Sequence, residues 1–330
     1  MPDKIKWGII GLGKIAHKFA TDLMFSENAA LQGVASRNAQ KAKDFATKYQ
    51  SKSHYGDYEL LAKSPDVEVI YIATPHSFHR ELTTMCLENS KAVLCEKPLG
   101  MNRDEVEAVI ALAKSKKLFL MEGLWTRFIP ATEKVMELIE TDAIGDVLYI
   151  HADFGFKSDF NPETRHFNKA LGGGSLLDIG IYPIFLSLVT LGYPKAIKAM
   201  ARMTKTNVDA SCSVLFDYIN GTKAMLHSSF EANTPTEAHI HGTKGSIKMH
   251  KQFHHTEKIT LFKDGKEPEV IHIPHTGNGY LHEIEEVNGC LKSGMIESEK
   301  LPQSMSLDLI RLLDQVRKEI NLSYLSRMEK

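Results

Sequence analysis

A lysine flanked by glutamate and proline is the first candidate for chemistry in this sequence. Lys97 follows a short apolar run and stands within Cys95-Glu96-Lys97-Pro98. A lysine in a dry cleft can donate a hydrogen bond to a substrate hydroxyl and stabilise the alkoxide character that develops as a hydride leaves. Glu96 and Pro98 would then fix its direction. The alternative interpretation is a solvated lysine at the end of a strand.

A second reactive pair lies in the glycine-rich segment 172–183, GGGSLLDIGIYP. Asp178 and Tyr182 are four residues apart, so in a helix they share one face and can reach a common site. A phenol with a reference pKa of ~10 is a poor base near neutral pH, but a neighbouring ammonium group favours its ionised form. A tyrosine packed in the core beside a capped helix is the alternative.

A glycine pattern near the N-terminus indicates a phosphate-binding loop. The apolar run Ile5–Ile10 leads directly into Gly11-Leu12-Gly13-Lys14-Ile15-Ala16, and a helical pattern follows. Gly11 permits a tight turn, Gly13 lets the backbone approach a pyrophosphate, and Ala16 keeps the helix close to the strand. The helix N-terminus supplies free N–H groups and a positive dipole end. This context predicts dinucleotide binding.

The tip of the second expected strand predicts which coenzyme binds. A site that prefers NAD usually has Asp or Glu there, to accept the ribose 2′-hydroxyl. This tip reads Val34-Ala35-Ser36-Arg37-Asn38 and has no carboxylate. Ser36 can hydrogen-bond a 2′-phosphate, and Arg37 can pair with it through its planar guanidinium group. We therefore expect NADP(H) to be preferred over NAD(H); an exposed cation that opens the next helix is the alternative.

Alternating strand and helix patterns in the first third of the chain predict βαβ units with a parallel, doubly wound sheet. The expected strands are Ile5–Ile10, Leu31–Ala35, Val67–Thr74, Ala92–Cys95 and Leu118–Met121. The expected helices are His17–Phe25, Ala39–Tyr49, Phe78–Asn89 and Arg103–Ser115. Asn102 followed by Glu105 predicts a helix N-cap with its box partner. Lys97 would then stand at the carboxyl end of a parallel strand, where ligands of such sheets bind.

The pattern changes after Glu122 and predicts an α+β domain with an open, mostly antiparallel sheet. Its expected elements are a helix at Ala131–Glu140, strands at Ile197–Met203, Ser211–Tyr218 and Lys223–Phe230 with an Asn220-Gly221 hairpin turn, and a helix at Ser306–Ile320. We therefore predict a dinucleotide-binding domain at residues 1–123 and a substrate-binding and dimerisation domain at 124–330. The sequence leaves open whether the final helix, near 306–320, packs on the first or the second domain.

Composition narrows the class of protein. The 330 residues are 43% hydrophobic and 25% charged, which is typical of a globular protein of two domains. Forty basic and forty-one acidic residues leave a net charge of −1, so we expect no nucleic-acid partner. We see no signal peptide and no stretch near the ~20 apolar residues of a membrane span, and we expect a cytoplasmic protein without a membrane partner.

Cysteines and histidines favour neither a disulfide framework nor a metal site. The four cysteines are widely spaced and form no CxxC pair. His239 and His241 would share a strand face, with His254 and His255 nearby, but no carboxylate partner accompanies them. We expect no bound metal. We expect these histidines to decorate a sheet face instead.

Four motifs together resemble the Gfo/Idh/MocA oxidoreductase family: GLGKIA, the segment Ala73-Thr74-Pro75-His76-Ser77-Phe78-His79, Glu96-Lys97-Pro98 and GGGSLLDIGIYP. The run Glu122–Phe128, EGLWTRF, is similar to the branch that contains dimeric dihydrodiol dehydrogenase and NADP-dependent D-xylose 1-dehydrogenase. The resemblance spans nearly the whole chain. It implies an α/β Rossmann domain followed by the α+β domain, and a homodimer formed through the C-terminal sheet.

The resemblance also implies roles for individual residues. Lys97, Asp178 and Tyr182 would be catalytic, with the family's lysine often preceding a cis-proline, here Pro98. Many relatives have histidine where this chain has Tyr182, so whether Lys97 or Tyr182 accepts the proton stays open. Coenzyme contacts would come from Gly11, Leu12, Gly13, Lys14, Ile15, Ser36, Arg37, Thr74, Pro75, His76, His79, Glu96 and Lys97. Substrate contacts would come from Trp125, Arg127, Phe128, Arg165, Asp178 and Tyr182.

The expected activity is hydride transfer between NADP(H) and a carbinol carbon of a small hydroxylated substrate, a sugar or trans-diol. Two other functions remain open for this fold. One is a regulator that binds NAD(P) without turnover, which the intact Lys97, Asp178 and Tyr182 disfavour. The other is NAD-dependent glycoside hydrolysis, which the missing acid at the second strand tip disfavours.

Overall fold

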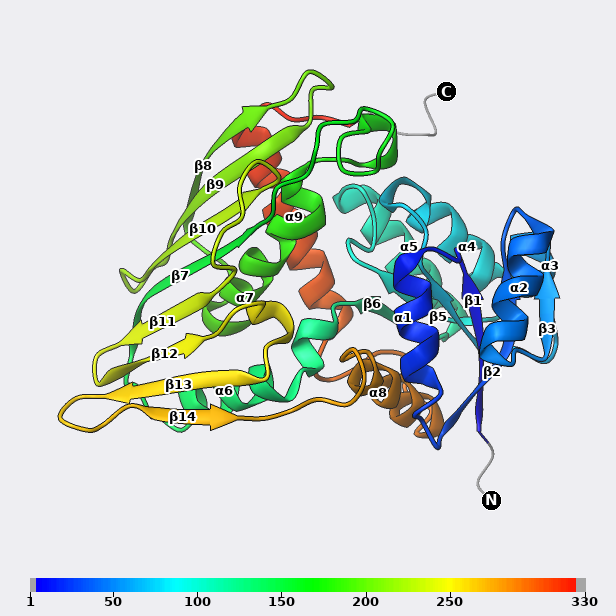
Figure 1. Ribbon diagram of the computed structural model, residues 1–330, viewed down its shortest axis with the longest axis horizontal. Helices are drawn as coiled ribbons and strands as arrows, with labels where there is room; N and C mark the ends of the chain where they lie inside the picture. The colour runs from blue at the N-terminus through cyan, green and yellow to red at the C-terminus, as the bar shows by residue number, and fades with distance from the viewer. Residues whose placement is uncertain (1–3, 325–330) are drawn as a thin grey trace. The chain divides into compact units, whose positions relative to one another are not determined.

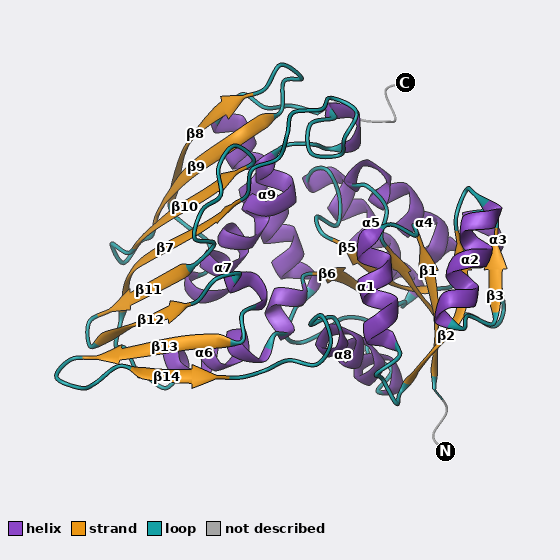
Figure 2. Cartoon of the chain, in the orientation of Figure 1, coloured by secondary structure: helices purple, strands orange, loops and turns teal. Residues whose placement is uncertain are grey.

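The chain separates into two compact units in the computed structural model, which describes residues 4–324. Unit 1 comprises Met1–Phe128 and Thr276–Leu307, and unit 2 comprises Ile129–His275 and Asp308–Lys330. Both units contain one sheet with helices packed on it (Figure 1, Figure 2). Each unit contains some of the residues that the sequence analysis predicted to be functional.

Unit 1 is built on a six-stranded sheet of order β3-β2-β1-β4-β5-β6, in which every pairing is parallel. The strands are β1 (Ile5–Ile10), β2 (Ala29–Ala35), β3 (Ser53–Tyr55), β4 (Val69–Ile72), β5 (Ala92–Glu96) and β6 (Leu120–Gly123). The predicted parallel α/β fold is confirmed, and every predicted strand has a counterpart. Strand β3 has none among the predictions because three residues are too few to show a periodic pattern.

Helices connect these strands by crossovers. They are α1 (Lys14–Leu23), α2 (Ala39–Tyr49), α3 (Tyr58–Ala62), α4 (His79–Glu88) and α5 (Arg103–Lys116), with short turns η1 (His76–Phe78) and η2 (Trp125–Phe128). The predicted cap of α5 is confirmed, because the Asn102 side chain accepts a hydrogen bond from the Glu105 backbone. The Glu105 carboxylate in turn accepts one from the Met101 backbone, one residue before the position usual in a capping box.

Strand order reverses between β1 and β4, which are neighbours in the sheet. The chain moves outward from β1 through β2 to β3, and in the opposite direction from β4 through β5 to β6. Because such crossovers are right-handed, helices of the two halves cover opposite faces of the sheet. The reversal leaves a crevice at the carboxyl ends of β1 and β4, which is where open α/β sheets bind ligands.

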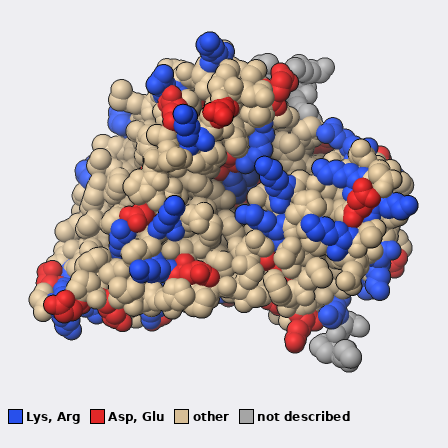
Figure 3. All heavy atoms as spheres, viewed as in Figure 1, with Lys and Arg blue, Asp and Glu red and all other residues tan. Residues whose placement is uncertain are grey.

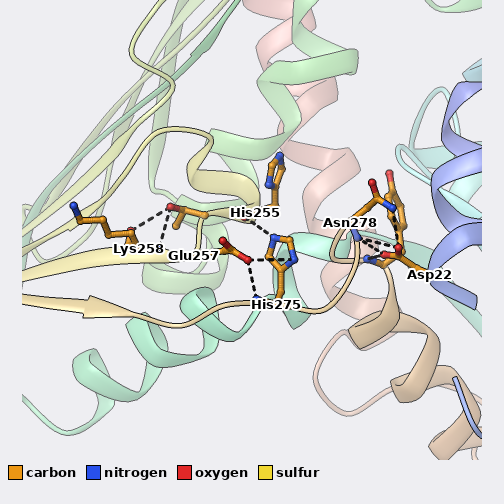
Figure 4. A network of polar contacts seen from close by, with 8 residues as sticks. Asp22, His255, Glu257, Lys258, His275 and Asn278 are labelled. Atoms are coloured by element: carbon orange, nitrogen blue, oxygen red, sulfur yellow. Dashed lines mark hydrogen bonds and ion pairs between the residues drawn. The ribbon is translucent and has the colours of Figure 1, made fainter. Parts of the chain in front are cut away.

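A late segment of the chain belongs to unit 1, and here the structure differs from the predicted domains. Unit 1 extends to Phe128 and regains Thr276–Leu307, which includes α8 (Leu281–Lys292). The buried Asp22 carboxylate fixes this segment (Figure 4), because it accepts hydrogen bonds from the Asn278 backbone and side chain and from the Tyr280 backbone. A buried carboxylate is costly without such partners, and no pattern in the sequence reveals them.

Unit 2 holds an eight-stranded sheet of order β14-β13-β12-β11-β7-β10-β9-β8, and only its β7–β10 pairing is parallel among the described residues. The strands are β7 (Val147–Gly155), β8 (Ala196–Met203), β9 (Asp209–Asp217), β10 (Lys223–Ser229), β11 (Ala238–Gly242), β12 (Gly245–Met249), β13 (Lys258–Lys263) and β14 (Glu269–His272). The predicted α+β domain with a mostly antiparallel sheet is confirmed, including the turn at Asn220-Gly221 between β9 and β10.

The helices of unit 2 include α6 (Pro130–Glu140), a π-helical turn η4 (Leu176–Gly180), α7 (Ile181–Leu191) and most of α9 (Gln303–Glu319), with short turns η3 (Lys169–Leu171) and η5 (Phe253–His255). The division between the units falls within α9, after Leu307. Contrary to our reading of the sequence, the helical stretch Lys169–Leu191 is long and apolar enough for a membrane span. It forms part of the core, since 83% of its most apolar window is buried.

Gly11 and Gly13, in the turn after β1, differ in the space available for a side chain. Substitution of each glycine by alanine therefore tests how the turn is built. Gly11 has a φ of +87°, and a Cβ there would lie 2.8 Å from the Ala73 carbonyl; at Gly13, with a φ of −84°, it would meet no described atom within 4 Å beyond its chain neighbours. We expect Gly11→Ala to lower the free energy of unfolding by about 2 kcal/mol or more, and Gly13→Ala by less than about 1 kcal/mol. Urea unfolding measures both, and equal losses would contradict this account of the turn.

Candidate functional site

The loop between β1 and α1 has the form of a phosphate cradle. Gly13 is the N-cap of α1 and makes no side-chain cap hydrogen bond, so the first N–H groups of the helix have no such acceptor in the described chain. Leu12 is buried while Gly13 and Lys14 are exposed, which anchors the loop on one side and opens it on the other. The space beside Gly13 would let an anionic group reach these N–H groups.

The tip of β2 adds a polar and a cationic side chain. Ser36 is buried, and its hydroxyl accepts a hydrogen bond from the Asn38 backbone. The Arg37 guanidinium group is exposed and lies 5.7 Å from the centre of the Phe78 ring. Both predicted residues therefore stand at the strand end, close to the crevice.

Lysines surround a cavity of about 350 Å³ between α1 and α2, which is lined by His17, Asn38, Gln40, Lys41, Asp44, Phe45 and Lys48. Burial lowers the pKa of His17, and the Lys48 and Lys41 ammonium groups lower it further. The exposed charged residues of the two helices are Lys14, Lys18, Lys41, Lys43, Lys48 and Asp44, so cations predominate there (Figure 3). The excess of positive charge would attract an anionic group to this part of unit 1.

The side chain of His79 links the loops that follow β4 and β5. It is fully buried; its Nδ1 lies 2.7 Å from the Pro98 carbonyl oxygen and its Nε2 lies 2.9 Å from that of Thr74. Burial lowers the pKa of His79, while the contacts with the two carbonyl groups oppose that change. The loop after β4, which carries Thr74 and Pro75, is thereby tied to the loop after β5.

Lys97 stands at the end of β5 and is 8% exposed. Its peptide bond to Pro98 is cis, as the family resemblance implies. The preceding residue, Glu96, accepts a hydrogen bond from the buried Tyr71 hydroxyl. Two residues later, the Leu99 backbone donates to the carboxylate of Glu122, 2.9 Å away. Contacts on both sides of Lys97 thus fix its backbone.

The turn after β6 contains the predicted substrate residues Trp125, Arg127 and Phe128. Trp125 stacks on Tyr280 with ring centres 4.4 Å apart, and Phe128 is buried. The Nε atom of Arg127 donates to the Lys300 carbonyl, so this nitrogen supports the fold of unit 1. Both rings of the Trp125–Tyr280 stack are buried.

In unit 2, Asp178 lies in η4 and is held by two neighbouring residues. Its Oδ1 accepts a hydrogen bond from the Arg165 guanidinium group at 2.9 Å, and its Oδ2 lies 3.8 Å from His166 Nε2. The other ring nitrogen of His166 is 3.0 Å from the Ser158 hydroxyl, and the ring stacks on Phe230. The structure therefore brings Arg165 and Asp178 together, and Arg165 orients the carboxylate.

Tyr182 follows one turn later, at the start of α7. The ring is 8% exposed, and its centre lies 5.7 Å from that of Phe154 and 4.9 Å from that of His254. Asp209 fixes the beginning of this helical segment, because its carboxylate accepts hydrogen bonds from the Ser175 hydroxyl and the Leu176 backbone. Burial raises the pKa of Asp209 to about 6. Asp178 and Tyr182 thus lie in one segment, and the buried carboxyl group of Asp209 holds the start of that segment.

Sequence reasoning assigned no chemistry to Glu122, His166 or Asp209. Each contacts a segment that carries a predicted catalytic residue. Glu122 opens the EGLWTRF run, and its place at a strand tip was the available signal. No comparable signal marks His166 or Asp209, because Asp178 lies 12 positions from His166 and Ser175 lies 34 positions from Asp209.

Comparisons with known proteins show the family and the fold of the chain. Residues 5–124 match the Gfo/Idh/MocA model described as an oxidoreductase family with an NAD-binding Rossmann fold, and residues 132–248 match the C-terminal domain of the same family. Trans-1,2-dihydrobenzene-1,2-diol dehydrogenase of Mus musculus is 38% identical over 97% of this chain and 98% of that protein. The Homo sapiens enzyme of that name is 36% identical over the same shares.

Solved structures extend the similarity to three dimensions. A 3-ketoreductase from Actinomadura kijaniata, in complex with NADP and TDP-benzene, is 25% identical with a TM-score of 0.86, over 96% of this chain and 98% of that one. Aldose-aldose oxidoreductase from Caulobacter crescentus shares the fold, with a TM-score of 0.88 at 24% identity, over 98% of this chain and all of that one. The chain belongs to the Gfo/Idh/MocA family of oxidoreductases.

Proposed function

We propose that this chain is an NADP-dependent oxidoreductase that transfers a hydride between the nicotinamide and a carbinol carbon of a sugar or trans-diol. The observation that carries the proposal is Lys97, a nearly buried cation at the carboxyl end of a parallel strand, in the same unit as a phosphate cradle. The relatives named dihydrodiol dehydrogenase support a diol as substrate.

The residues of unit 1 fit a nicotinamide dinucleotide. The space beside Gly13 and the open N-terminus of α1 would hold the pyrophosphate, and the tip of β2 would hold the adenosine ribose. When bound, the coenzyme supplies the acceptor or donor of the hydride. Lys97 then donates a hydrogen bond to the substrate oxygen and stabilises its negative charge.

Unit 2 carries two further residues whose side chains suit this chemistry. The Tyr182 hydroxyl can exchange a proton with a substrate hydroxyl. Asp178, with its Oδ1 held by Arg165, accepts a hydrogen bond from the substrate and orients the reacting carbon. Trp125 is 6% exposed and stacks on Tyr280, so in the proposed site it would pack behind the substrate rather than offer an open ring face.

Replacing the lysine tests the mechanism. We expect Lys97→Met to lower kcat by about 10²–10⁴-fold while NADPH affinity stays nearly unchanged, because the lost group acts on the substrate oxygen. Steady-state kinetics and NADPH fluorescence titration measure the two effects. The exposed Lys114→Met serves as the control and keeps normal turnover. Full activity of Lys97→Met would remove this lysine from the mechanism.

Substrate class is decided by a spectrophotometric panel. Aldopentoses, aldohexoses and trans-diols are each assayed with NADP and with NAD by the absorbance of the reduced nicotinamide. We expect reduction of NADP with at least one of these substrates. A regulator would bind the coenzyme without any change in absorbance, and a glycoside hydrolase would form products without net reduction of the coenzyme.

The preference for NADP rests on charge at the adenosine end. The tip of β2 has no carboxylate, and Arg37 and the lysines of α1 and α2 surround it with positive charge. We expect Arg37→Ala to raise the Kd for NADPH by about 10–100-fold, which is the loss of one charge-assisted hydrogen bond, and to leave NADH binding unchanged. Fluorescence titration measures both. Lys63→Ala, which removes a surface cation paired with Glu59, is the control; equal losses for both coenzymes would contradict the proposal.

We also propose a homodimer through the sheet of unit 2. The helices of this unit lie on one side of the sheet (Figure 2), and the other side exposes apolar side chains such as Met200 (81%), Leu215 (43%) and Met225 (48%). A cavity of about 540 Å³ lies among them, lined by residues of β7, β8, β9 and β10. Exposed apolar patches of this kind mark association surfaces, and a second copy offers a matching one.

A charge placed on this sheet face tests the dimer. We expect Met200→Glu combined with Leu215→Glu to convert a dimer of the wild-type chain to monomer, because two buried carboxylates would meet an apolar partner surface. Size-exclusion chromatography with light scattering reports the mass. Leu60→Glu changes an exposed apolar residue of α3 in unit 1, away from this sheet, and serves as the control. A wild-type monomer at micromolar concentration would refute the proposal.

A further inference from the structure

Glu122 is a buried acid beside the segment that carries Lys97. It lies on β6 and is 3% exposed, opposite Cys95 of β5 in the sheet register. Its Oε1 accepts a hydrogen bond from the Leu99 backbone at 2.9 Å. The other carboxylate oxygen, Oε2, is buried and makes no hydrogen bond with the described residues. Glu122 therefore contacts the loop only two residues beyond the proposed catalytic lysine.

The charges around Glu122 come from the adjacent strand and loop. Burial raises the pKa of Glu122 to about 7; the nearby Ser306 hydroxyl, the Leu99 N–H group and the Lys97 ammonium group lower it, and Glu96 raises it. Cys95 is the other titratable group that faces it, and burial keeps that thiol protonated by raising its pKa. Among these groups the Lys97 ammonium is the cation, so it is the group that can offset the charge of a buried Glu122 carboxylate.

We propose that Glu122 is the counter-ion and positioning residue of Lys97. Its carboxylate holds the backbone two residues after the lysine and supplies the negative charge that keeps the ammonium group directed at the substrate oxygen. The inference rests on the proposed function for its effect on turnover. The proximity of the two groups rests on the sheet register, in which Glu122 lies opposite Cys95, two residues before Lys97, and on the contact with Leu99, two residues after it.

Glu105 provides a matched comparison in the same loop. Its Oε2 accepts a hydrogen bond from the Met101 backbone at 2.9 Å, as Glu122 does from Leu99. Glu105 belongs to the first turn of α5 and is only partly buried. Both carboxylates therefore anchor the loop after β5, but only the role proposed for Glu122 includes the charge of Lys97.

Protonation of Glu122 predicts a pH dependence. As the pH falls through about 7, the carboxylate is neutralised, so the ammonium group loses its counter-charge and the contact with Leu99 weakens. We expect kcat of the full-length enzyme to fall on this acidic limb. Glu122→Gln should lower kcat by about 10–100-fold at pH 8 and abolish the limb near pH 7, with a small change in the KM for NADP.

The kinetic test compares Glu122→Gln, Glu122→Asp and Glu105→Gln over pH 5.5–9. Glu122→Asp keeps the charge, and we expect it to recover part of kcat and to retain the acidic limb. Glu105→Gln should keep the wild-type profile. A wild-type profile for Glu122→Gln, or the same change in Glu105→Gln, would overturn the proposal.

A second measurement does not depend on turnover. Carbon-13 NMR of the full chain, labelled at glutamate carboxyl carbons, follows the Glu122 signal, which is assigned by its loss in Glu122→Gln or Glu122→Asp. We expect it to titrate near pH 7 and to titrate at higher pH in Lys97→Met, because the nearby cation is gone. An unchanged titration in Lys97→Met would overturn the pairing. If the enzyme oxidises none of the panel substrates, the proposed function fails while this titration still decides the inference.

Discussion

The positive charge of Lys97 is almost out of water, at the end of a strand that is buried along most of its length. A charge in such a place raises the free energy of the folded chain unless polar groups and an opposite charge surround it. Most other features of this part of unit 1 meet that requirement. They also give the lysine one direction, which a proton or hydrogen-bond donor needs in order to act on one atom of a substrate.

The support for this lysine comes from several strands at once. The Tyr71 hydroxyl of β4 holds Glu96, the carboxylate of Glu122 in β6 holds Leu99, and buried His79 links the loops after β4 and β5. The parallel sheet makes this possible because it brings the carboxyl ends of all its strands to one edge. These contacts link the loops after β4 and β5 to each other and to β6, so displacement of one loop would disturb its neighbours.

In unit 2, too, a buried carboxyl group holds a functional segment, which here is a helix rather than the end of a strand. Asp209 is a buried acid that receives hydrogen bonds from the first residues of the segment bearing Asp178 and Tyr182. Arg165 then orients Asp178, and aromatic rings surround Tyr182. In both units a buried carboxyl group that touches no substrate in our proposal fixes a segment that does. Such groups act on the geometry of the site through the backbone.

Local sequence determined the elements and the motifs of this protein. The glycines after β1, the lysine after β5 and the alternation of strands with helices are patterns of neighbouring residues, and the parallel sheet follows from them with few alternatives. Only the tertiary structure decided the rest. Residues 276–307 return to unit 1 through contacts with Asp22, more than 250 positions earlier in the chain. The buried carboxylate of Glu122 is held by the backbone N–H group of Leu99, in another loop. Contacts between residues that are distant in the sequence leave no periodic pattern in it, because they form only when folding brings those residues together.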